Sequence, residues 1–240
     1  MRKFALLLVI LAVLLVAADF GARAYAESRA ATAVQQELGT AAEPDVSIEG
    51  FPFLVHATQG RYPQVVITAT DVDNAALPGI RAVATLSSVA LPLRDMINHD
   101  TSALTAQATR LQVLVPLASL SAALGQPNLT LSAAPDGSVA VSTTLSIAGQ
   151  QVPLTGTAAI TVAQDTLTIA VKSLSAAGLD VTPVITAAAD ALVGGLSKSF
   201  PLVGLPFTVT SADIAVAGGD VVITATTGPV ALDELRAARR

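Results

Sequence analysis

The N-terminal segment constrains this chain more than any other feature of its sequence. Arg2 and Lys3 precede an unbroken apolar run from Phe4 to Ala18, and the small-x-small triplet Ala24-Tyr25-Ala26 follows. A basic start, an apolar stretch of about 7 to 15 residues and a small-x-small site are the three parts of a secretory signal peptide. Because the basic end of such a segment stays in the cytoplasm, everything after Ala26 is expected outside it.

Two fates of residues 1–26 remain open. The pattern favours a signal peptide cleaved after Ala26, because the apolar run is shorter than the roughly 20 residues that span a bilayer. A retained N-terminal membrane anchor is the alternative, since Asp19 and Arg23 make the segment before the cleavage site long and atypical. Burial of Asp19 near an interface would extend the uncharged stretch. Either way, residues 27–240 are expected to be exported, to the periplasm or the cell envelope.

Composition indicates that the exported part is stabilised by an apolar core. The chain has no cysteine, so no disulfide can stabilise it. Hydrophobic residues make up 52% of the 240 residues and charged residues 13%, which excludes a disordered chain. A formal net charge of −5 and 3% aromatic residues provide neither a basic stripe for phosphates nor a stacking platform for bases. We therefore expect no nucleic-acid partner.

Strands dominate the middle of the chain. From Ser138 onward, apolar residues such as Val139 and Val141 alternate with serine, threonine or alanine, which is the two-residue period of a half-buried strand. Turn residues separate three such stretches, so consecutive strands are expected to pair as an antiparallel meander. The predicted strands are residues 138–147, 152–162 and 166–172.

Helices are predicted on both sides of these strands. Alanine, glutamate and glutamine favour a helix that continues from the N-terminal apolar run to a C-cap at Gly39. Thr182 and Pro183 suit the first positions of another helix, and Gly125 suits the end of a third. The predicted helices are residues 24–38, 116–124 and 182–200. The fold class is therefore α+β.

An internal repeat is the most unusual feature of the exported part. Residues 50–55, GFPFLV, are echoed by residues 204–209, GLPFTV, and each copy precedes the hexamer VVITAT, at 65–70 and 221–226. The shared order favours a duplicated strand-turn-strand unit over chance in a chain rich in valine, threonine and alanine. Each copy is therefore expected to begin a strand. The hexamer side chains expected to face inward are Val65, Ile67 and Ala69, and Val221, Ile223 and Ala225.

These same residues carry a resemblance to a known family. The apolar N-terminus running into an Ala-rich helix, residues 50–54, the Gly60-x-Tyr62 motif and residues 204–207 are similar to the actinobacterial LmeA-like phospholipid-binding family, typified by the lipomannan elongation factor. The resemblance covers nearly the whole chain, and its motifs are structural, not catalytic. It implies an elongated antiparallel β-sheet wrapped around two or three helices, as in tubular lipid-binding proteins.

The resemblance also implies a function. Such a protein associates with the membrane surface of the cell envelope, binds phospholipid, with phosphatidylinositol as one candidate, and supports envelope lipid or lipoglycan maturation. It implies no cofactor and no residue-level site. Residues 27–240 would form a single lipid-binding domain, in which the repeat suggests two related modules at about 45–125 and 126–235.

A lipid-binding site of this kind needs a dry apolar groove, since each acyl methylene that is buried contributes about 0.8 kcal/mol. We expect its walls from the stripe of the helix over 182–200 and from the two repeat segments, although each side chain would also fit an ordinary core. The candidate lipid-binding residues are Phe51, Phe53, Leu192, Leu196, Phe200, Val203, Leu205 and Phe207. Four arginines are either partners of a headgroup phosphate or solvated surface charges: Arg61, Arg81, Arg94 and Arg110.

Motifs of enzyme chemistry are nearly absent. The sequence holds no cysteine nucleophile, no Gly-x-Ser-x-Gly elbow, no Gly-rich phosphate loop and no His-x-x-x-His metal pair. Asp71-x-Asp73 lacks the glycine and the distal glutamate of a calcium loop, so we expect no metal site. Phospholipid binding is the preferred interpretation. A non-catalytic envelope scaffold is the first alternative, and a hydrolase built on His99 is the least favoured.

Overall fold

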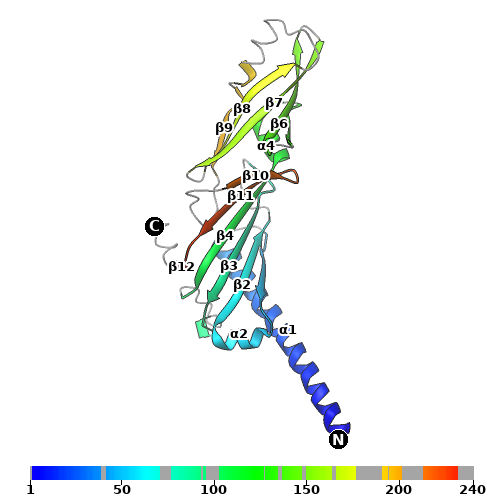
Figure 1. The fold of residues 1–240 in the computed structure, drawn as a ribbon, viewed down its shortest axis with the longest axis vertical. Coiled ribbons are helices and arrows are strands. Elements are labelled where there is room, and N and C mark those ends of the chain that lie inside the picture. The colour runs from blue at the N-terminus through cyan, green and yellow to red at the C-terminus, as the bar shows by residue number, and fades with distance from the viewer. Residues whose placement is uncertain are drawn as a thin grey trace. The chain divides into compact units, whose positions relative to one another are not determined.

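Helices and antiparallel strands make up the described part of the chain (Figure 1). The computed structural model describes residues 2–38, 42–70, 77–92, 94–95, 103–126, 128–134, 137–147, 150–163, 166–176, 191–193, 195–201 and 213–231. Contacts divide the chain into two compact units. Unit 1 comprises Met1–Ala69, Val83–Leu111 and Thr226–Arg240, and unit 2 comprises Thr70–Ala82 and Gln112–Ala225.

The first helix joins two segments of the sequence. Helix α1 runs without a break from Arg2 to Leu38, so the apolar run and the Ala-rich segment form one rod of 37 residues, about 55 Å long. The helix predicted over 24–38 is confirmed as the last part of α1. Residue 26, where the sequence places the cleavage site, is helical and buried in unit 1.

Two sheets contain the strands, where the family resemblance implied a single one. The first sheet has the order β1-β2-β3-β4-β11-β10, with β12 paired to β4. Its strands are β1 (Asp45–Glu49), β2 (Arg61–Ala69), β3 (Arg81–Ala90), β4 (Thr105–Pro116), β10 (Asp213–Ala217), β11 (Asp220–Thr227) and β12 (Val230–Ala231). The α+β class and the antiparallel pairing are confirmed. The wrapping of a sheet around helices stays a prediction.

The second sheet belongs to unit 2 and has the order β5-β6-β7-β8-β9. Its strands are β5 (Thr130–Ala133), β6 (Val139–Ile147), β7 (Gln150–Ala163), β8 (Thr166–Ala176) and β9 (Lys198–Pro201). Strands β6, β7 and β8 pair consecutively and antiparallel, which confirms the predicted meander. Alternate residues such as Val139 and Val141 in β6, and Leu167 and Ile169 in β8, are buried, so one face of this sheet forms the core.

Helix α4 (Leu117–Leu124) packs against the second sheet as its predicted apolar positions require. Pro116 is its N-cap, and Gly125 ends it in the left-handed conformation with φ 71°. Its leucines 117, 120 and 124 are all buried. The Lys198 ammonium group, on β9, donates to the carbonyl oxygens of Ala123 and Leu124, both at 3.1 Å. A cation is favourable there because the C-terminus of a helix carries unsatisfied carbonyl groups and partial negative charge.

The helix predicted over 182–200 is wrong at its C-terminal end. Residues 191–193 are helical, but Phe200 lies in β9, opposite Leu167 of β8. The adjacent glycines 194 and 195 weaken a helix by about 1 kcal/mol each relative to alanine, and the pairing with β8 gives the next residues a strand ladder instead. Most of the predicted helix, including Thr182, lies outside the described residues.

The segment from Gly50 also differs from its prediction, because it does not begin a strand. Residues Phe53–Gln59 form helix α2, with Pro52 at the N-cap. Phe53 and Ala57, one helical turn apart, are the two buried residues of α2, so the segment buries an i, i+4 face against the core of unit 1. Proline suits the start of a helix because the N–H groups there have no acceptor inside the helix, so the missing N–H of proline costs no hydrogen bond.

The hexamers are the part of the predicted repeat that can be compared within the described residues. Residues 65–69 lie in β2 and residues 221–226 in β11, and each of these strands pairs with the strand that precedes it. In β11 the predicted inward residues Val221, Ile223 and Ala225 are buried, whereas in β2 Ala69 is buried and Val65 and Ile67 are only half-buried. The second copy of the GxPF segment lies outside the described residues. The duplication and the two modules therefore stay predictions.

Candidate membrane and lipid site

The apolar part of α1 is exposed in the structure. Among the described residues, α1 is the one helix long and apolar enough to cross a membrane, with a mean hydropathy of 2.7 in its most apolar stretch. Its large side chains are turned to the outside from Phe4, 68% exposed, to Phe20, 58% exposed. A helix that is apolar all round and not covered by protein is suited to lipid.

Asp19 ends the apolar stretch of α1, but its charge is enclosed by the protein. The residue is 5% exposed. Its Oδ2 accepts a hydrogen bond from the Phe53 N–H at 2.9 Å, and its Oδ1 accepts one from the Leu54 N–H at 2.8 Å. These two groups open α2, where the N–H groups lack partners inside the helix and the helix dipole is positive. The carboxylate thus joins α1 to α2.

A second polar contact joins α1 to the first sheet. Arg23 Nε donates to Glu27 Oε1 at 2.8 Å, and Arg23 Nη2 donates to Ser47 Oγ in β1 at 3.2 Å. The same Glu27 oxygen accepts the N–H of Ile48 at 2.8 Å. Because these bonds are directional and half-buried, they fix both the position and the rotation of α1 on β1.

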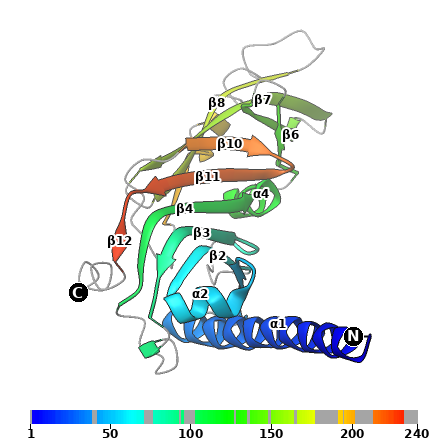
Figure 2. The same cartoon turned by 60° about the horizontal axis from the view of Figure 1, so that its bottom comes forward.

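Apolar packing completes this junction. Ala22 and Ala26 of α1 contact the core of unit 1, which also contains Phe53 and Tyr62, whose ring centroids lie 6.2 Å apart. Figure 2 shows α2 beside α1 and next to the start of β2. Burial raises the pKa of Tyr62 above its usual value of 10.0. The second half of α1 is thus an integral part of the fold of unit 1.

An exposed apolar surface lies directly beside this junction. Phe51, before α2, is 63% exposed, and Leu54 and Val55 on the outer side of α2 are 40% and 47% exposed. The Phe51 ring lies 6.2 Å from the ring of Phe20 on α1. We call Phe20, Phe51, Leu54 and Val55 the apolar patch.

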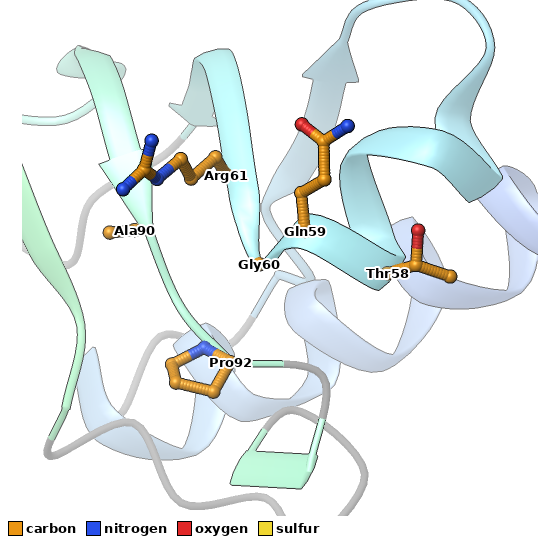
Figure 3. Close-up of a pocket in the computed structure, with 6 residues that line it drawn as sticks. All are labelled: Thr58, Gln59, Gly60, Arg61, Ala90 and Pro92. Carbon is orange, nitrogen blue, oxygen red and sulfur yellow. The ribbon is translucent and has the colours of Figure 1, made fainter.

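A cavity of about 310 Å³ opens at the other end of α2. Figure 3 shows Thr58 and Gln59 at the end of the helix, Arg61 on β2, and Ala90 and Pro92 on the neighbouring segment. Gly60, the remaining lining residue, has φ 63° and ends α2. Ligand pockets usually measure about 300–1,000 Å³, so this open cavity lies at the lower end of that range and is too small for a whole phospholipid.

The four candidate arginines are all exposed, and the structure separates Arg61 from the rest. Arg61 lines the cavity, whereas Arg94 pairs with the neighbouring Asp95 at 3.2 Å between Nε and Oδ1. Arg81 and Arg110 lie on β3 and β4 and do not line this cavity. Arg61 is therefore the best-placed of the four for a phosphate.

The predicted walls of the acyl groove fall into both units. Phe51 is exposed and Phe53 is buried in the core of unit 1, while Leu192, Leu196 and Phe200 belong to unit 2. Leu196 is 0% and Phe200 7% exposed, which is the burial of core residues. Leu192 is half-buried and packs against Val152 and Leu154. The other three candidates, Val203, Leu205 and Phe207, lie outside the described residues.

Groups for catalysis or metal binding are sparse in the described part of the chain. No set of three or more histidine, aspartate or glutamate side chains there could hold a metal ion. His56 lies half-buried on α2, and His99 lies outside the described residues.

Comparison with known proteins identifies the family. A family profile described as LmeA-like phospholipid-binding matches residues 17–226. The chain belongs to the LmeA-like phospholipid-binding family. The resemblance inferred from the sequence is thus confirmed. No curated protein and no solved structure matches the chain significantly.

The start of the LmeA-like match bears on the junction. Because the matched region begins at residue 17, it includes Asp19, Arg23 and Glu27, which precede or adjoin the predicted cleavage site. The sequence patterns singled out none of these three as functional. The signal that could have found them is an acid directly after an apolar run, where an unpaired charge is costly, followed by an Arg-Glu pair at i, i+4.

Proposed function

We propose that this protein is an exported, cell-envelope phospholipid-binding protein that stays attached to the cytoplasmic membrane through α1. Membership of the LmeA-like phospholipid-binding family supports the ligand class. The exposed apolar half of α1, with Arg2 and Lys3 before it, supports the location. In this role the protein supports maturation of envelope lipids or lipoglycans without catalysing a reaction itself.

The observation that carries the proposal is the enclosure of the Asp19 carboxylate by the first N–H groups of α2. Cleavage after Ala26 would remove Asp19 and Arg23 and leave the amides of Phe53 and Leu54 without their acceptor. A hydrogen bond to a charged group contributes about 1.5–3 kcal/mol to stability, so the loss of these two bonds would weaken the fold of unit 1. A retained anchor, the alternative left open by the sequence, is therefore favoured over a cleaved signal peptide.

The proposed ligand has two parts with different requirements. An anionic headgroup, with that of phosphatidylinositol as the candidate, would use a cation. The acyl chains would use the apolar groove predicted from the sequence. Three candidate wall residues of unit 2 are described, and Leu192 is the one that is only half-buried. An acyl chain would therefore reach Leu192 more easily than Leu196 or Phe200.

Lipid analysis of protein purified in mild detergent from its own host tests the proposal. We expect a stoichiometric amount of phospholipid on the native chain and a marked loss in Leu192→Arg. Ala191→Arg, at the exposed neighbouring position, is the matched control and should keep its lipid. Native protein without phospholipid would identify an envelope scaffold instead. Phospholipid that is consumed on incubation would identify a hydrolase, and Leu192→Arg that keeps its lipid would place the groove elsewhere.

A further inference from the structure

We propose that the apolar patch lies in the outer interface of the bilayer that α1 crosses, so that α2 is an interfacial helix and its partner is a lipid surface. The inference rests on the proposed function in one respect, namely that α1 is retained. It adds which part of the exported domain touches lipid and how the domain is oriented on the membrane.

The length of α1 places the membrane boundary beside α2. The run from Phe4 to Ala18 is only about 22 Å long at about 1.5 Å per residue, whereas a hydrocarbon core is about 30 Å thick. Because the Asp19 charge is enclosed, the stretch without an exposed charge continues to Ala22 and reaches about 28 Å. The boundary therefore falls at the level where Asp19 holds the N–H groups of Phe53 and Leu54.

The apolar patch continues the lipid-facing surface of α1 at this level. Phe20 follows directly after Asp19 on the helix, and its ring contacts that of Phe51 with centroids 6.2 Å apart. Leu54 and Val55 extend the same surface along α2, while Phe53 and Ala57 on the opposite side are buried. Exposed apolar groups next to a spanning helix would be solvated poorly by water and well by acyl chains.

Polar residues begin where the headgroups are expected. Tyr25, 64% exposed, lies about 10 Å beyond Ala18 along α1. Its hydroxyl accepts a hydrogen bond from Arg29 Nε at 3.1 Å, and the guanidinium carbon lies 5.2 Å from the ring centroid. Tyrosine and arginine favour this zone of a membrane. On α2 the exposed residues change in the same way, from Leu54 and Val55 to Thr58 and Gln59.

Site-specific fluorescence on the full chain tests the inference, and the absence of native cysteines makes single labelling possible. Val55→Cys carries an environment-sensitive nitrobenzoxadiazole label, and the chain is reconstituted into phosphatidylcholine–phosphatidylglycerol vesicles. Gln36→Cys is the matched control, exposed on α1 about 24 Å beyond Phe20. We expect the label at position 55 to emit at shorter wavelength and to be quenched several-fold more strongly by lipids spin-labelled near the headgroup.

Three results would overturn the inference. Equal, water-like emission from both labels would place α2 away from the bilayer. A disulfide-linked dimer that forms in unlabelled Val55→Cys but not in unlabelled Gln36→Cys would show that a second copy of the chain covers the patch. If Val55→Cys does not fold, Phe51→Cys at the more exposed position replaces it, and a water-like signal there has the same meaning.

The outcome is separable from that of the proposed function. A water-like label at position 55 on protein that still carries its phospholipid contradicts the interfacial position alone. A lipid-exposed label at position 55 on protein without bound phospholipid supports the interfacial position and contradicts the proposed function.

Discussion

Unit 1 leaves several large apolar side chains exposed, whereas unit 2 encloses the large apolar side chains of its core. In unit 1, α2 buries Phe53 and Ala57, whereas Phe51, Leu54 and Val55 are exposed. In unit 2, Leu196, Leu154 and Leu167 are fully buried, and the second sheet with α4 encloses its apolar side chains. The fold of unit 1 thus leaves part of its apolar surface uncovered, and this is the surface that we propose to contact lipid.

The comparison also shows what holds each region. The Asp19 carboxylate and small alanines join α1 to α2, and the Arg23 guanidinium group joins α1 to β1, so the outward face of α2 is not needed for folding. The core of unit 2 contains fully buried apolar side chains such as Leu154, Leu167 and Leu196, so these leucines are not available for contact with lipid. Exposure of large side chains at a polar junction is therefore a better indicator of a lipid-contacting surface than apolar composition alone.

The largest expected effect separates the two uses of leucine. Leu196→Ala should lower the free energy of unfolding by about 2–5 kcal/mol, because it removes a fully buried side chain and leaves a cavity. Leu54→Ala should change it by no more than about 0.5 kcal/mol, since Leu54 is an exposed position. Urea unfolding in detergent measures both. Equal losses would show that α2 buries its outer face in protein and would break the comparison.

The second-largest effect is expected at the polar contact between α1 and α2. Asp19→Ala should cost about 1–3 kcal/mol, because the N–H groups of Phe53 and Leu54 lose their acceptor. Hydrogen exchange of these two amides should accelerate, while amides of β7 keep their protection. Asp45→Ala, at the exposed start of β1, is the control and should change neither the free energy of unfolding nor the exchange of these two amides. Unchanged exchange in Asp19→Ala would contradict the role of Asp19 as the α2 cap.

A smaller effect is expected at the polar contact that caps α4. Lys198→Met keeps most of the side-chain volume but removes the ammonium group bound to the carbonyls of Ala123 and Leu124. We expect a loss of about 0.3–1 kcal/mol, the usual value of a charge at a helix terminus. Lys172→Met, exposed on β8, is the control and should be neutral in thermal unfolding. A neutral Lys198→Met would show that the apolar packing of α4 suffices.

The smallest effect concerns the core of unit 1 at high pH. Burial raises the pKa of Tyr62 in the folded chain above the usual value of 10.0, so the unfolded chain loses this proton first. Stability should therefore fall as the pH rises above the usual pKa of 10.0, and Tyr62→Phe should reduce this fall. The measurement is the free energy of unfolding of the native chain and of Tyr62→Phe at pH values on both sides of 10.0. An identical pH dependence in Tyr62→Phe would show that Tyr62 is not the group responsible.

The sequence predicted the elements that local pattern determines. The β6–β8 meander follows from alternation and turn residues, and α4 follows from Pro116, three in-phase leucines and Gly125. Helix α2 could not be found in the same way, because its cap is supplied by Asp19, 34 residues earlier in the chain. Phe200 was misassigned because strand pairing with Leu167 overrides a helical spacing that two glycines had already weakened.

The candidate site shows the same limit. Family resemblance indicated the ligand class, but composition could not tell buried from exposed apolar residues, so Leu196 and Phe51 were grouped although one is fully buried and the other 63% exposed. The apolar patch depends on the contact between Phe20 and Phe51, which no spacing in the sequence predicts.

Native mass spectrometry of the protein extracted from the membranes of its host tests the central claim most directly, because one spectrum reports both the chain and its ligand. We predict a polypeptide that retains Asp19 and the rest of α1, with a phospholipid that is released on collisional activation. A polypeptide that begins at Glu27, or a full-length one that carries no phospholipid, would contradict a membrane-attached phospholipid-binding protein.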